Sequence, residues 1–367
     1  MIERIGIVGG GQLGQMLTQA AKPLGFEVLV VDPNENSPAA QVGADQIQAK
    51  LTDIDAIADL AASTDVITWE IEHIPADFLI SLVEGGKDVQ PSPITLFMIQ
   101  DKLTQKQFLR EAGIPVADFS SDLSGASFLG GGPYVVKSRK GGYDGRGNLV
   151  LDTLDEQAVS NFFGDIPVYV EKAVAFEKEL AVIAARDKSG NVVTYPAVET
   201  IHENSICNMV ISPAQVEDKV LRQANDIANE TLKRLDGAGV FAIEMFVVGG
   251  EVLVNEIAPR VHNSGHHTIE ANQTSQFEQH IRAVTNMPLG STAMRFPVAV
   301  MINILGKREE PMSLEGIDKV LALPDTHLHL YGKSPRQARK IGHITVLGQN
   351  LSDTTELALK ARSYLAI

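Results

Sequence analysis

The chain has 367 residues, a formal net charge of −15 and a single cysteine, Cys207. This length predicts two or three domains, the acidic charge opposes binding to nucleic acid or anionic membrane, and one cysteine excludes an intrachain disulfide and a cysteine-based zinc site. The sequence holds no apolar run of about 18 residues that could span a bilayer, and no signal peptide is visible. We therefore expect a cytoplasmic protein in which Cys207 is a small buried residue.

Residues 1–100 alternate between apolar runs and helical patterns. The patterns predict strands at 5–8, 28–31 and 66–69 and helices at 12–24 and 55–62. Such a βαβ series is typical of a parallel sheet covered by helices. We expect this first domain to end near residue 100, beyond the proline-rich joint at 91–93.

A second domain is predicted over residues 101–295, where helical and strand patterns mix. One helix is expected over 94–112, across the joint. The other predicted elements are strands at 134–137, 168–171, 179–186, 191–195, 241–248 and 251–255 and a helix at 217–235. Two hairpins should turn at 187–190 and 249–250. Residues 296–367 predict a small β-rich domain, with strands at 327–331 and 342–346 and a helix at 354–365.

The first predicted strand runs into Gly9-x-Gly11-x-x-Gly14, and Asp32 ends the second. This spacing matches a dinucleotide-binding turn with Asp32 on a ribose hydroxyl. The turn aims amide groups at an anion, which is either a pyrophosphate or one phosphate of another substrate. A nicotinamide-dependent oxidoreductase therefore stays open, as does a turn without any ligand, although nothing downstream supports the nicotinamide cofactor.

A second glycine-rich segment, residues 141–147, begins four residues after Lys137. Its four glycines permit the backbone conformations that a loop needs to fold over phosphates. Lys102, Lys137, Lys140 and Arg146 supply positive charge in an otherwise acidic chain. The alternative is a solvated surface loop.

Two carboxylates fall on the hairpin that turns at 249–250. With that turn, Glu244 and Glu256 reach adjacent strands near the same end, and Asn255 adds an amide oxygen. These oxygen ligands suit hard cations, and two magnesium ions bridging ATP phosphates would neutralise the charge that builds during phosphoryl transfer. The alternative is a pair of exposed acids.

Residues 258–267 are dense in hydrogen-bond donors and nearly free of apolar side chains. We expect this segment to lie outside the core, as a solvated loop or a site loop. Its histidines could indicate a metal site, but the oxygen-rich neighbourhood argues against zinc.

Together and in this order, these features resemble the ATP-grasp superfamily and, within it, the 5-(carboxyamino)imidazole ribonucleotide synthase family of purine biosynthesis. The resemblance covers almost the whole chain. The segments that carry it are 9–14, 70–75, 100–106, 137, 141–147, 171–174, 255–266, 274–280, 331–333 and 339–343. The chain departs from the family at Lys102, where arginine is frequent, at Val261, a usual proline, and at His267, where an aromatic is common. The stretch between Lys333 and Arg339 is also one residue short, which leaves open whether Arg336, Arg339 or Lys340 binds the ribonucleotide phosphate.

The resemblance implies an ATP-grasp fold with an N-terminal Rossmann-like parallel-sheet domain, a lid at about 115–175 and a small β-rich C-terminal domain. It implies an ADP-forming ligase that carboxylates 5-aminoimidazole ribonucleotide with bicarbonate, through carboxyphosphate. It also implies ATP and two Mg²⁺ ions, with Mn²⁺ as a substitute, and a homodimer that binds neither nucleic acid nor membrane.

Site roles carry over by position. The implied catalytic residues are Asp144, Arg146 and Lys333, with Asp144 accepting the amine proton. The implied ATP-binding residues are Lys102, Lys137, Gly142, Tyr143, Asp144, Gly145, Arg146, Gly147, Asn148, Glu171, Lys172, Ala173, Val174, Glu179, His202, Asn255 and Glu256. The implied ribonucleotide-binding residues are Gln12, Leu13, Glu70, Tyr143, Arg146, Lys333 and Arg339. The implied magnesium ligands are Glu244 and Glu256.

Two further classes stay open. Another ATP-grasp ligase, such as a formate-using transformylase or a biotin carboxylase, shares the nucleotide residues, so the distinction depends on segments 70–75 and 333–343. A non-catalytic nucleotide-binding or scaffolding protein would be expected to lose Glu244 and Glu256, and both are present.

Overall fold

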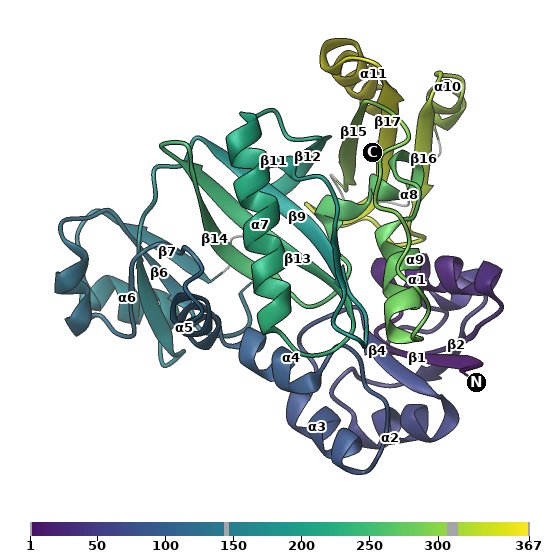
Figure 1. The fold of residues 1–367 in the computed structure, drawn as a ribbon, viewed down its shortest axis with the longest axis horizontal. Coiled ribbons are helices and arrows are strands. Elements are labelled where there is room, and N and C mark those ends of the chain that lie inside the picture. Colours follow the sequence, from purple (N-terminus) through teal and green to yellow (C-terminus); the bar gives the residue numbers. More distant parts are fainter. Residues whose placement is uncertain (1, 143–146, 307–314, 366–367) are drawn as a thin grey trace.

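The computed structural model describes residues 2–142, 147–306 and 315–365. Tyr143, Asp144, Gly145 and Arg146, four of the predicted site residues, lie outside these ranges. Figure 1 shows the N-terminal sheet with its helices on one side of the molecule, a small sheet on the opposite side, and a long sheet between and above them. None of the helices in the described ranges is both long and apolar enough to cross a membrane.

The N-terminal residues form a four-stranded parallel sheet in the order β3-β2-β1-β4, which confirms the predicted fold class of this region. Its strands are β1 (Arg4–Val8), β2 (Glu27–Asp32), β3 (Asp45–Gln48) and β4 (Val66–Trp69), and its helices are α1 (Gln12–Ala21), α2 (Ile54–Ser63) and α3 (Ala76–Glu84). Alternate residues of each strand point to opposite faces. Ile7 therefore packs with Leu17 of α1, whereas Val8 packs with Leu60 of α2. Strand β3 and helix α3 were not predicted, and the predicted helix 12–24 ends at Ala21, followed by a 3-10 turn, η1 (Lys22–Leu24).

The single helix predicted over 94–112 is wrong, because Asp101 divides it into α4 (Pro93–Gln100) and α5 (Lys102–Glu111). Asp101 has extended backbone, and its carboxylate accepts hydrogen bonds from the amides of Leu103 and Thr104. This is the N-cap arrangement that aspartate favours. The break places Lys102 in the first turn of α5.

A small antiparallel sheet follows in the order β5-β8-β6-β7. Its strands are β5 (Phe119–Ser120), β6 (Tyr134–Ser138), β7 (Asn148–Leu151) and β8 (Val168–Lys172). Helix α6 (Glu156–Phe163) and the 3-10 turn η3 (Ser124–Leu129) cover it, with Val159 and Phe163 packed on Val136 and Val170. The glycine-rich segment joins β6 to β7, and β7 was not predicted.

The long sheet has the order β14-β13-β9-β11-β12-β15-β17-β16, and β10 pairs with β9. Its strands are β9 (Lys178–Arg186), β10 (Val192–Thr194), β11 (Val198–Glu203), β12 (Ile206–Ser212), β13 (Gly239–Val248), β14 (Glu251–Ala258), β15 (Val298–Leu305), β16 (Thr326–Leu330) and β17 (Lys340–Gly348). Both predicted hairpins, β9–β10 and β13–β14, are confirmed. Strands β11, β12 and β15 were not predicted. The C-terminal strands extend the long sheet through the β12–β15 pair, while the domain boundaries themselves remain predictions.

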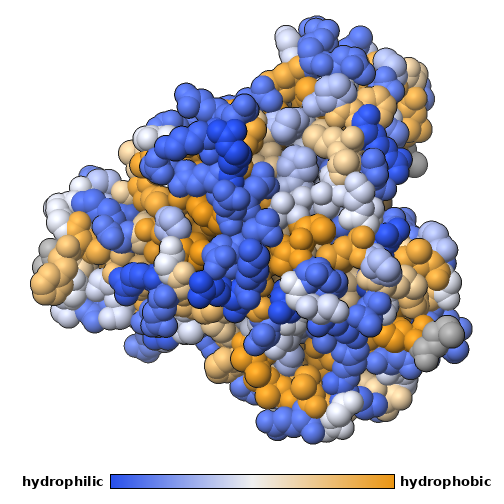
Figure 2. All heavy atoms as spheres, in the orientation of Figure 1, coloured by the Kyte–Doolittle hydropathy of each residue, from blue (hydrophilic) through white to orange (hydrophobic). Residues whose placement is uncertain are grey.

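Helices cover this sheet on both faces. Helix α7 (Asp218–Arg234) lies across one face in Figure 1, where Ala228 and Leu232 pack on Val182 and Ile243, and Figure 2 shows hydrophilic residues over its outer side. Helix α9 (Gln276–Val284) packs on the other face and also on α1. The remaining helical segments are η2 (Ala40–Val42), η4 (Asn263–Gly265), α8 (Thr268–Ala271), α10 (Ile317–Leu321) and α11 (Leu351–Ser363). By joining α1 to the long sheet, α9 fixes the N-terminal domain against the centre of the molecule.

Candidate functional site

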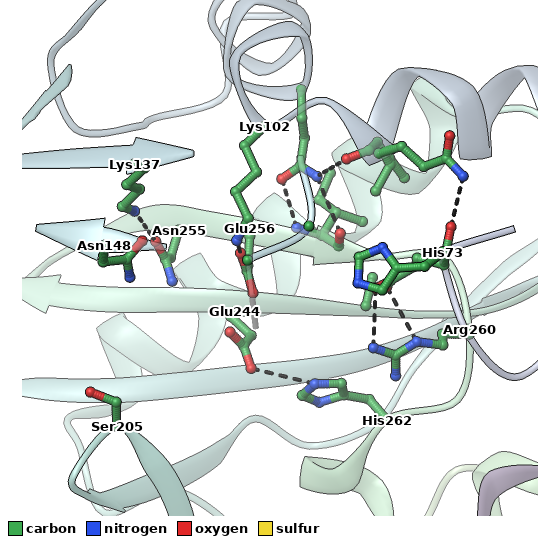
Figure 3. A pocket seen from close by; sticks show the side chains of 18 of the residues that line it. His73, Lys102, Lys137, Asn148, Ser205, Glu244, Asn255, Glu256, Arg260 and His262 are labelled. Carbon is green, nitrogen blue, oxygen red and sulfur yellow. Dashed lines mark hydrogen bonds and ion pairs between the residues drawn. The ribbon is translucent and has the colours of Figure 1, made fainter. Parts of the chain in front are cut away.

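A cavity of about 300 Å³ lies where α5, β6 and the β13–β14 hairpin meet (Figure 3). It collects eight of the residues predicted to bind ATP: Lys102, Lys137, Gly142, Asn148, Glu179, His202, Asn255 and Glu256. Glu244 also lines it. The predicted adenine-slot residues Glu171, Lys172, Ala173 and Val174 are not in its lining, and neither is Gly147. The cavity therefore brings together the residues predicted to bind the phosphates and the metal, whereas the adenine slot remains a prediction.

The carboxylates of Glu244 and Glu256 face the cavity from adjacent strands. The two residues are direct partners in the β13–β14 register, as the hairpin pattern predicted. Burial and the neighbouring charge of Glu256 raise the pKa of Glu244 to about 7. Burial also opposes ionisation of Glu256, but its ion pair with Lys102 holds the pKa of Glu256 below the ordinary value. Two close carboxylates, one of them poorly compensated, form a local excess of negative charge.

These residues fit Mg²⁺. The ligands offered are carboxylate oxygens from Glu244 and Glu256, with the amide oxygen of Asn255 nearby. In the described residues, no group of three or more histidine, cysteine, aspartate or glutamate side chains is arranged to hold a metal by itself. Mg²⁺ differs from zinc in that it binds through one or two carboxylates together with substrate phosphates. The donor set is therefore appropriate to a metal that arrives with a nucleotide.

Lys137 is held in the cavity by a buried ion-pair network. Its Nζ lies 2.8 Å from the Glu171 carboxylate and donates to Asn255 Oδ1 at 3.2 Å (Figure 3). Glu171 also pairs with Lys106 at 3.3 Å and accepts a hydrogen bond from the Tyr169 hydroxyl at 2.6 Å. Burial opposes ionisation of Glu171, but Lys137 and Lys106 lower its pKa to about 2. Lys106 and Tyr169 were not among the predicted site residues, although Lys106 belongs to the segment 100–106 that carries the family resemblance.

Glu179 and His202 meet on the opposite wall, on the paired strands β9 and β11. His202 Nδ1 lies 3.1 Å from Glu179 Oε2. Burial favours the neutral ring, but the hydrogen bond and the charge of Glu179 raise the pKa of His202 above its ordinary value. Ser205 lies nearby in the lining, and no sequence signal identified it. This wall supplies a carboxylate and hydrogen-bonding groups where polar parts of a nucleotide could bind.

A second cavity, of about 710 Å³, lies between the N-terminal domain and the C-terminal strands. It is lined by all five described residues predicted to bind the ribonucleotide: Gln12, Leu13, Glu70, Lys333 and Arg339. Lys333 Nζ donates to Gln12 Oε1 at 2.8 Å. Arg336 and Lys340 line the same cavity, so all three alternatives for the phosphate site reach it. The positive charge of this cavity suits a phosphate.

The two cavities share a wall made of Glu72, His73, Arg260 and His262. Arg260 pairs with Glu72 at 3.3 Å, and His262 Nε2 points at Glu244 Oε1 from 3.5 Å (Figure 3). Burial, together with the charge of Arg260, holds the pKa of His262 well below its ordinary value, so the ring is neutral. None of these four residues was assigned a role from the sequence, because their importance comes from lying between two sites.

The first glycine turn does not present its amides to an external anion. Glu70 accepts hydrogen bonds from Gly11 and Gly14, at 2.5 and 2.7 Å, and Asp32 accepts one from Gly10 at 3.0 Å. Gly9 has φ +106°, and a Cβ there would lie 2.4 Å from Glu70 Cγ. The internal carboxylates thus occupy the positions that a pyrophosphate would need, which overturns the dinucleotide-binding interpretation of this turn.

The expectation that residues 258–267 lie outside the core is wrong for part of the segment, whereas its site-loop alternative is confirmed by Arg260 and His262, which line both cavities. Val261, Ser264, His266 and His267 are all buried, and Cys207 is buried as expected. Many polar groups of the segment find partners inside the protein, as buried polar groups require, whereas the Nε2 atoms of His266 and His267 are buried without a hydrogen-bond partner among the described residues. Asn263 and Asn303 exchange two side-chain hydrogen bonds, at 2.7 and 2.9 Å, which tie this segment to β15.

Family models match the chain in three consecutive parts. They describe a ribonucleotide synthetase preATP-grasp domain over residues 2–100, an ATP-grasp domain over 107–277 and a phosphoribosylaminoimidazole carboxylase C-terminal domain over 299–357. Together with the cavity that gathers Lys102, Lys137, Glu244 and Glu256, these matches define the chain as an ATP-grasp ligase, in agreement with the expected fold class.

Known relatives narrow this class. The N5-carboxyaminoimidazole ribonucleotide synthase of Synechococcus elongatus is 39% identical over 100% of this chain and 94% of its own length. The synthetase of Thermotoga maritima has a crystal structure with a TM-score of 0.90 and 44% identity, covering 99% of both chains. The phosphoribosylaminoimidazole carboxylase of Ogataea methanolica is 43% identical over 96% of this chain, which spans only 67% of that longer protein. This chain belongs to the N5-carboxyaminoimidazole ribonucleotide synthase family.

Proposed function

We propose that this protein carboxylates 5-aminoimidazole ribonucleotide with bicarbonate and ATP, giving N5-carboxyaminoimidazole ribonucleotide, ADP and phosphate, a step of purine biosynthesis. The single observation that supports this most strongly is the pair of cavities with a common wall. One cavity holds the paired carboxylates and lysines that suit a metal-bound nucleotide, and the other holds Lys333 and four further cationic residues, Arg260, Arg336, Arg339 and Lys340. A related synthase from Aspergillus clavatus, 34% identical with a TM-score of 0.90, has been solved in complex with ADP and 5-aminoimidazole ribonucleotide.

In the first cavity, Lys102 and Lys137 bind the nucleotide phosphates, and the ion pair with Glu171 fixes the Lys137 ammonium. Glu244 and Glu256 would hold magnesium, which would supply positive charge against the phosphates. We propose two ions, for which Mn²⁺ can substitute. Glu179 and His202 bind the ribose side of the nucleotide, and Gly142 and Asn148 belong to the loop over the phosphates.

In the second cavity, Glu70 and Gln12 bind the ribonucleotide, and Arg339 binds its phosphate. Burial lowers the pKa of Lys333, an effect that the charge of Glu70 opposes. Lys333 is therefore suited to hold or receive a proton near the reacting amine, and Asp144 remains the predicted base. Bicarbonate lies between the two cavities, where Arg260 supplies positive charge and His262 a neutral ring. The shared wall makes transfer between the cavities short, because a reactive carboxyphosphate does not have to cross open solvent.

We propose a homodimer in the cytoplasm that takes small-molecule substrates and binds neither nucleic acid nor membrane, which the net charge of −15 supports.

ADP release is the test. It is measured with ATP, Mg²⁺ and bicarbonate, with and without 5-aminoimidazole ribonucleotide. We expect strong stimulation by the ribonucleotide, with ¹³C from labelled bicarbonate appearing in the product carbamate. Absence of stimulation in folded protein that binds ATP would retain the ATP-grasp class and reject this acceptor. Stimulation by a different acceptor, such as the substrate of a formate-using transformylase, would favour that alternative.

A further inference from the structure

Three buried glutamines make an unusual set of contacts. Each side-chain amide binds both the N–H and the C=O of one residue that is distant in sequence or lies in another segment. The pairs are Gln105 with Ile257 at 2.8 and 3.2 Å, Gln276 with His262 at 2.9 and 2.7 Å, and Gln279 with Gly290 at 2.7 and 2.8 Å. All three glutamines are 2% exposed or less. A primary amide carries one acceptor and two donor hydrogens, so it can satisfy both backbone groups of a residue as a neighbouring strand would.

We call each such pair of hydrogen bonds from one glutamine side chain an amide clamp. Two of these clamps hold a segment that borders the site. Ile257 follows Glu256 directly, and His262 lies in the shared wall, so Gln105 and Gln276 hold the two ends of segment 257–262. Between them, the Trp69 indole donates to Pro259 O at 3.1 Å and Arg260 pairs with Glu72. The segment is therefore held at its ends by amide clamps and at its middle by the N-terminal domain.

The Gln276 clamp is built into the fold. The backbone N–H of Gln276 donates to Thr268 Oγ1 at 2.9 Å, and Gln276 is the first residue of α9, whose Phe277 and Ile281 lie in the core. A Cβ at Gly265 would approach Gln276 Oε1 to 2.6 Å, so the close packing of this side chain requires glycine there. These contacts fix the position of Gln276 independently of its hydrogen bonds to His262.

His262 depends on its main chain for its position. Its ring contacts Ser264 Oγ through Nδ1 at 2.9 Å and faces Glu244 through Nε2 at 3.5 Å (Figure 3). Ser264 lies only two residues further along the same segment, so a shift of the His262 backbone would move ring and partner together. An error of about 1 Å in placing a reacting centre can cost about 100-fold in rate.

We infer that Gln276 is a positioning residue for the reaction: by binding both backbone groups of His262 it sets the wall between the two cavities, and Gln105 does the same at the other end. This inference rests on the proposed function for the identity of the substrates. Gln276 acts through His262 and touches neither cavity, whereas Gln279, three residues further along α9, makes the same clamp on Gly290 away from both cavities.

The test compares Gln276→Glu with Gln279→Glu. When the introduced carboxyl is protonated it can accept from the N–H and donate to the C=O, as glutamine does; when ionised it can only accept, and it repels the carbonyl. The titratable group that faces it is His266, whose Nδ1 lies 3.3 Å from Gln276 Nε2 and whose pKa burial holds well below the ordinary value. For folded Gln276→Glu we expect kcat to fall about tenfold or more relative to wild type as pH rises through the pKa of the introduced carboxyl, with KM for ATP unchanged. For Gln279→Glu we expect thermal stability to fall as pH rises through the pKa of the introduced carboxyl. Its kcat should follow the wild-type pH profile.

Several outcomes decide the inference. Equal loss of kcat in both variants, or a wild-type kcat profile in folded Gln276→Glu, would overturn it. If Gln276→Glu does not fold, Gln276→Met is compared with Gln279→Met: each loses both hydrogen bonds to its backbone partner, and only Gln276→Met is expected to lower kcat by about tenfold or more. The wild-type response to 5-aminoimidazole ribonucleotide is measured first, so a wrong acceptor is recognised separately. In that case kcat is read from bicarbonate-dependent ATP hydrolysis, which uses the same wall.

Discussion

The carboxylate of Glu70 accepts a hydrogen bond from the amide of Gly11 at 2.5 Å, across 59 positions of sequence. Glu70 therefore occupies the place in a glycine turn that a phosphate takes in dinucleotide-binding proteins. Burial raises the pKa of this carboxyl, although the amides of Gly14 and Gly11 and the charge of Lys333 oppose the rise. The contact joins the first strand–turn–helix unit to the end of β4 and makes one wall of the second cavity.

Replacing Glu70 by glutamine should weaken ribonucleotide binding. Gly11 and Gly14 each donate an N–H group to one oxygen of Glu70. Glutamine has only one side-chain oxygen, so its NH2 group would face one of these two donors. Leaving one buried group unsatisfied costs about 1–3 kcal/mol of folded-state stability, which favours displacement of the introduced side chain from the turn. Because this side chain lines the second cavity, we expect the displacement to raise KM for 5-aminoimidazole ribonucleotide by about fivefold or more. Steady-state ADP release measures this, and KM for ATP should not change. Binding of a nicotinamide dinucleotide to the wild-type protein, followed by fluorescence, would contradict the assignment of the turn.

Replacing Glu256 or Glu244 by glutamine should abolish most turnover. Each substitution removes one carboxylate of the pair that faces the nucleotide cavity. Metal-ion stabilisation is worth several kcal/mol, so we expect kcat to fall by about 100-fold or more. Glu251→Gln is the matched control, since Glu251 lies on the same hairpin but pairs with Lys219 at its exposed turn. Near-wild-type turnover in Glu256→Gln would reject the metal assignment.

Magnesium binding should release protons near neutral pH. Burial and Glu256 raise the pKa of Glu244 to about 7, so this carboxyl is partly protonated at pH 6–7, whereas a metal needs its ionised form. Affinity for Mg²⁺ should therefore increase as pH rises from 6 to 8. Calorimetry in two buffers of different ionisation enthalpy measures the released protons. A binding enthalpy that does not depend on the buffer at pH 7 would argue against Glu244 as a ligand, and Glu244→Gln should remove the proton release.

Glu171 should stabilise the fold at neutral pH and less so in acid. Its pKa falls from 4.5 to about 2 in the folded protein, because Lys137 and Lys106 outweigh the effect of burial. A depressed carboxyl pKa contributes stability that is present above about pH 4.5 and is lost as pH falls toward 2. Breaking a buried pair from one side costs about 3–5 kcal/mol. We expect Glu171→Gln to lower the free energy of unfolding by about this amount at pH 7.

Urea unfolding at several pH values measures this effect. The difference between wild type and Glu171→Gln should shrink between pH 4.5 and pH 3. Glu177→Gln is a control on the same side of the molecule, because Glu177 accepts its hydrogen bond from the Gly249 amide at a more exposed position. A difference that stays constant over this pH range would show that the ion pairs are not its source.

Arg339 should be the main contact for the ribonucleotide phosphate. A guanidinium can bind a phosphate with two charge-assisted hydrogen bonds. Loss of one such contact is worth about 1.5–3 kcal/mol, so Arg339→Gln should raise KM for 5-aminoimidazole ribonucleotide about ten- to a hundredfold without changing KM for ATP. Arg295→Gln is the control, since Arg295 binds Gln273 O away from both cavities. A larger effect of Arg336→Gln would assign the phosphate to Arg336 instead.

Local patterns in the sequence were enough to predict much of the fold. Strand β4 was predicted with its observed bounds, and the hairpin turn at 249–250 led directly to the pairing of Glu244 with Glu256. Period and turn chemistry determine such features over a few residues, so they can be read without tertiary contacts. The break at Asp101 could also have been found, because aspartate before a helix is an N-cap signal. The prediction of one helix over 94–112 did not take this signal into account.

Tertiary structure alone decided what these local elements bind. Nothing in the spacing of Gly9, Gly11 and Gly14 indicates that Glu70 occupies the turn, because the partner comes from another strand. Residues 258–267 look solvent-exposed by composition, yet Gln276 and Asn303 supply buried partners that allow polar groups into the core. The alternation of strands, helices and turns was thus determined by the sequence itself. Which polar group meets which depended on packing, since a hydrogen bond or ion pair between distant segments exists only once the chain has folded.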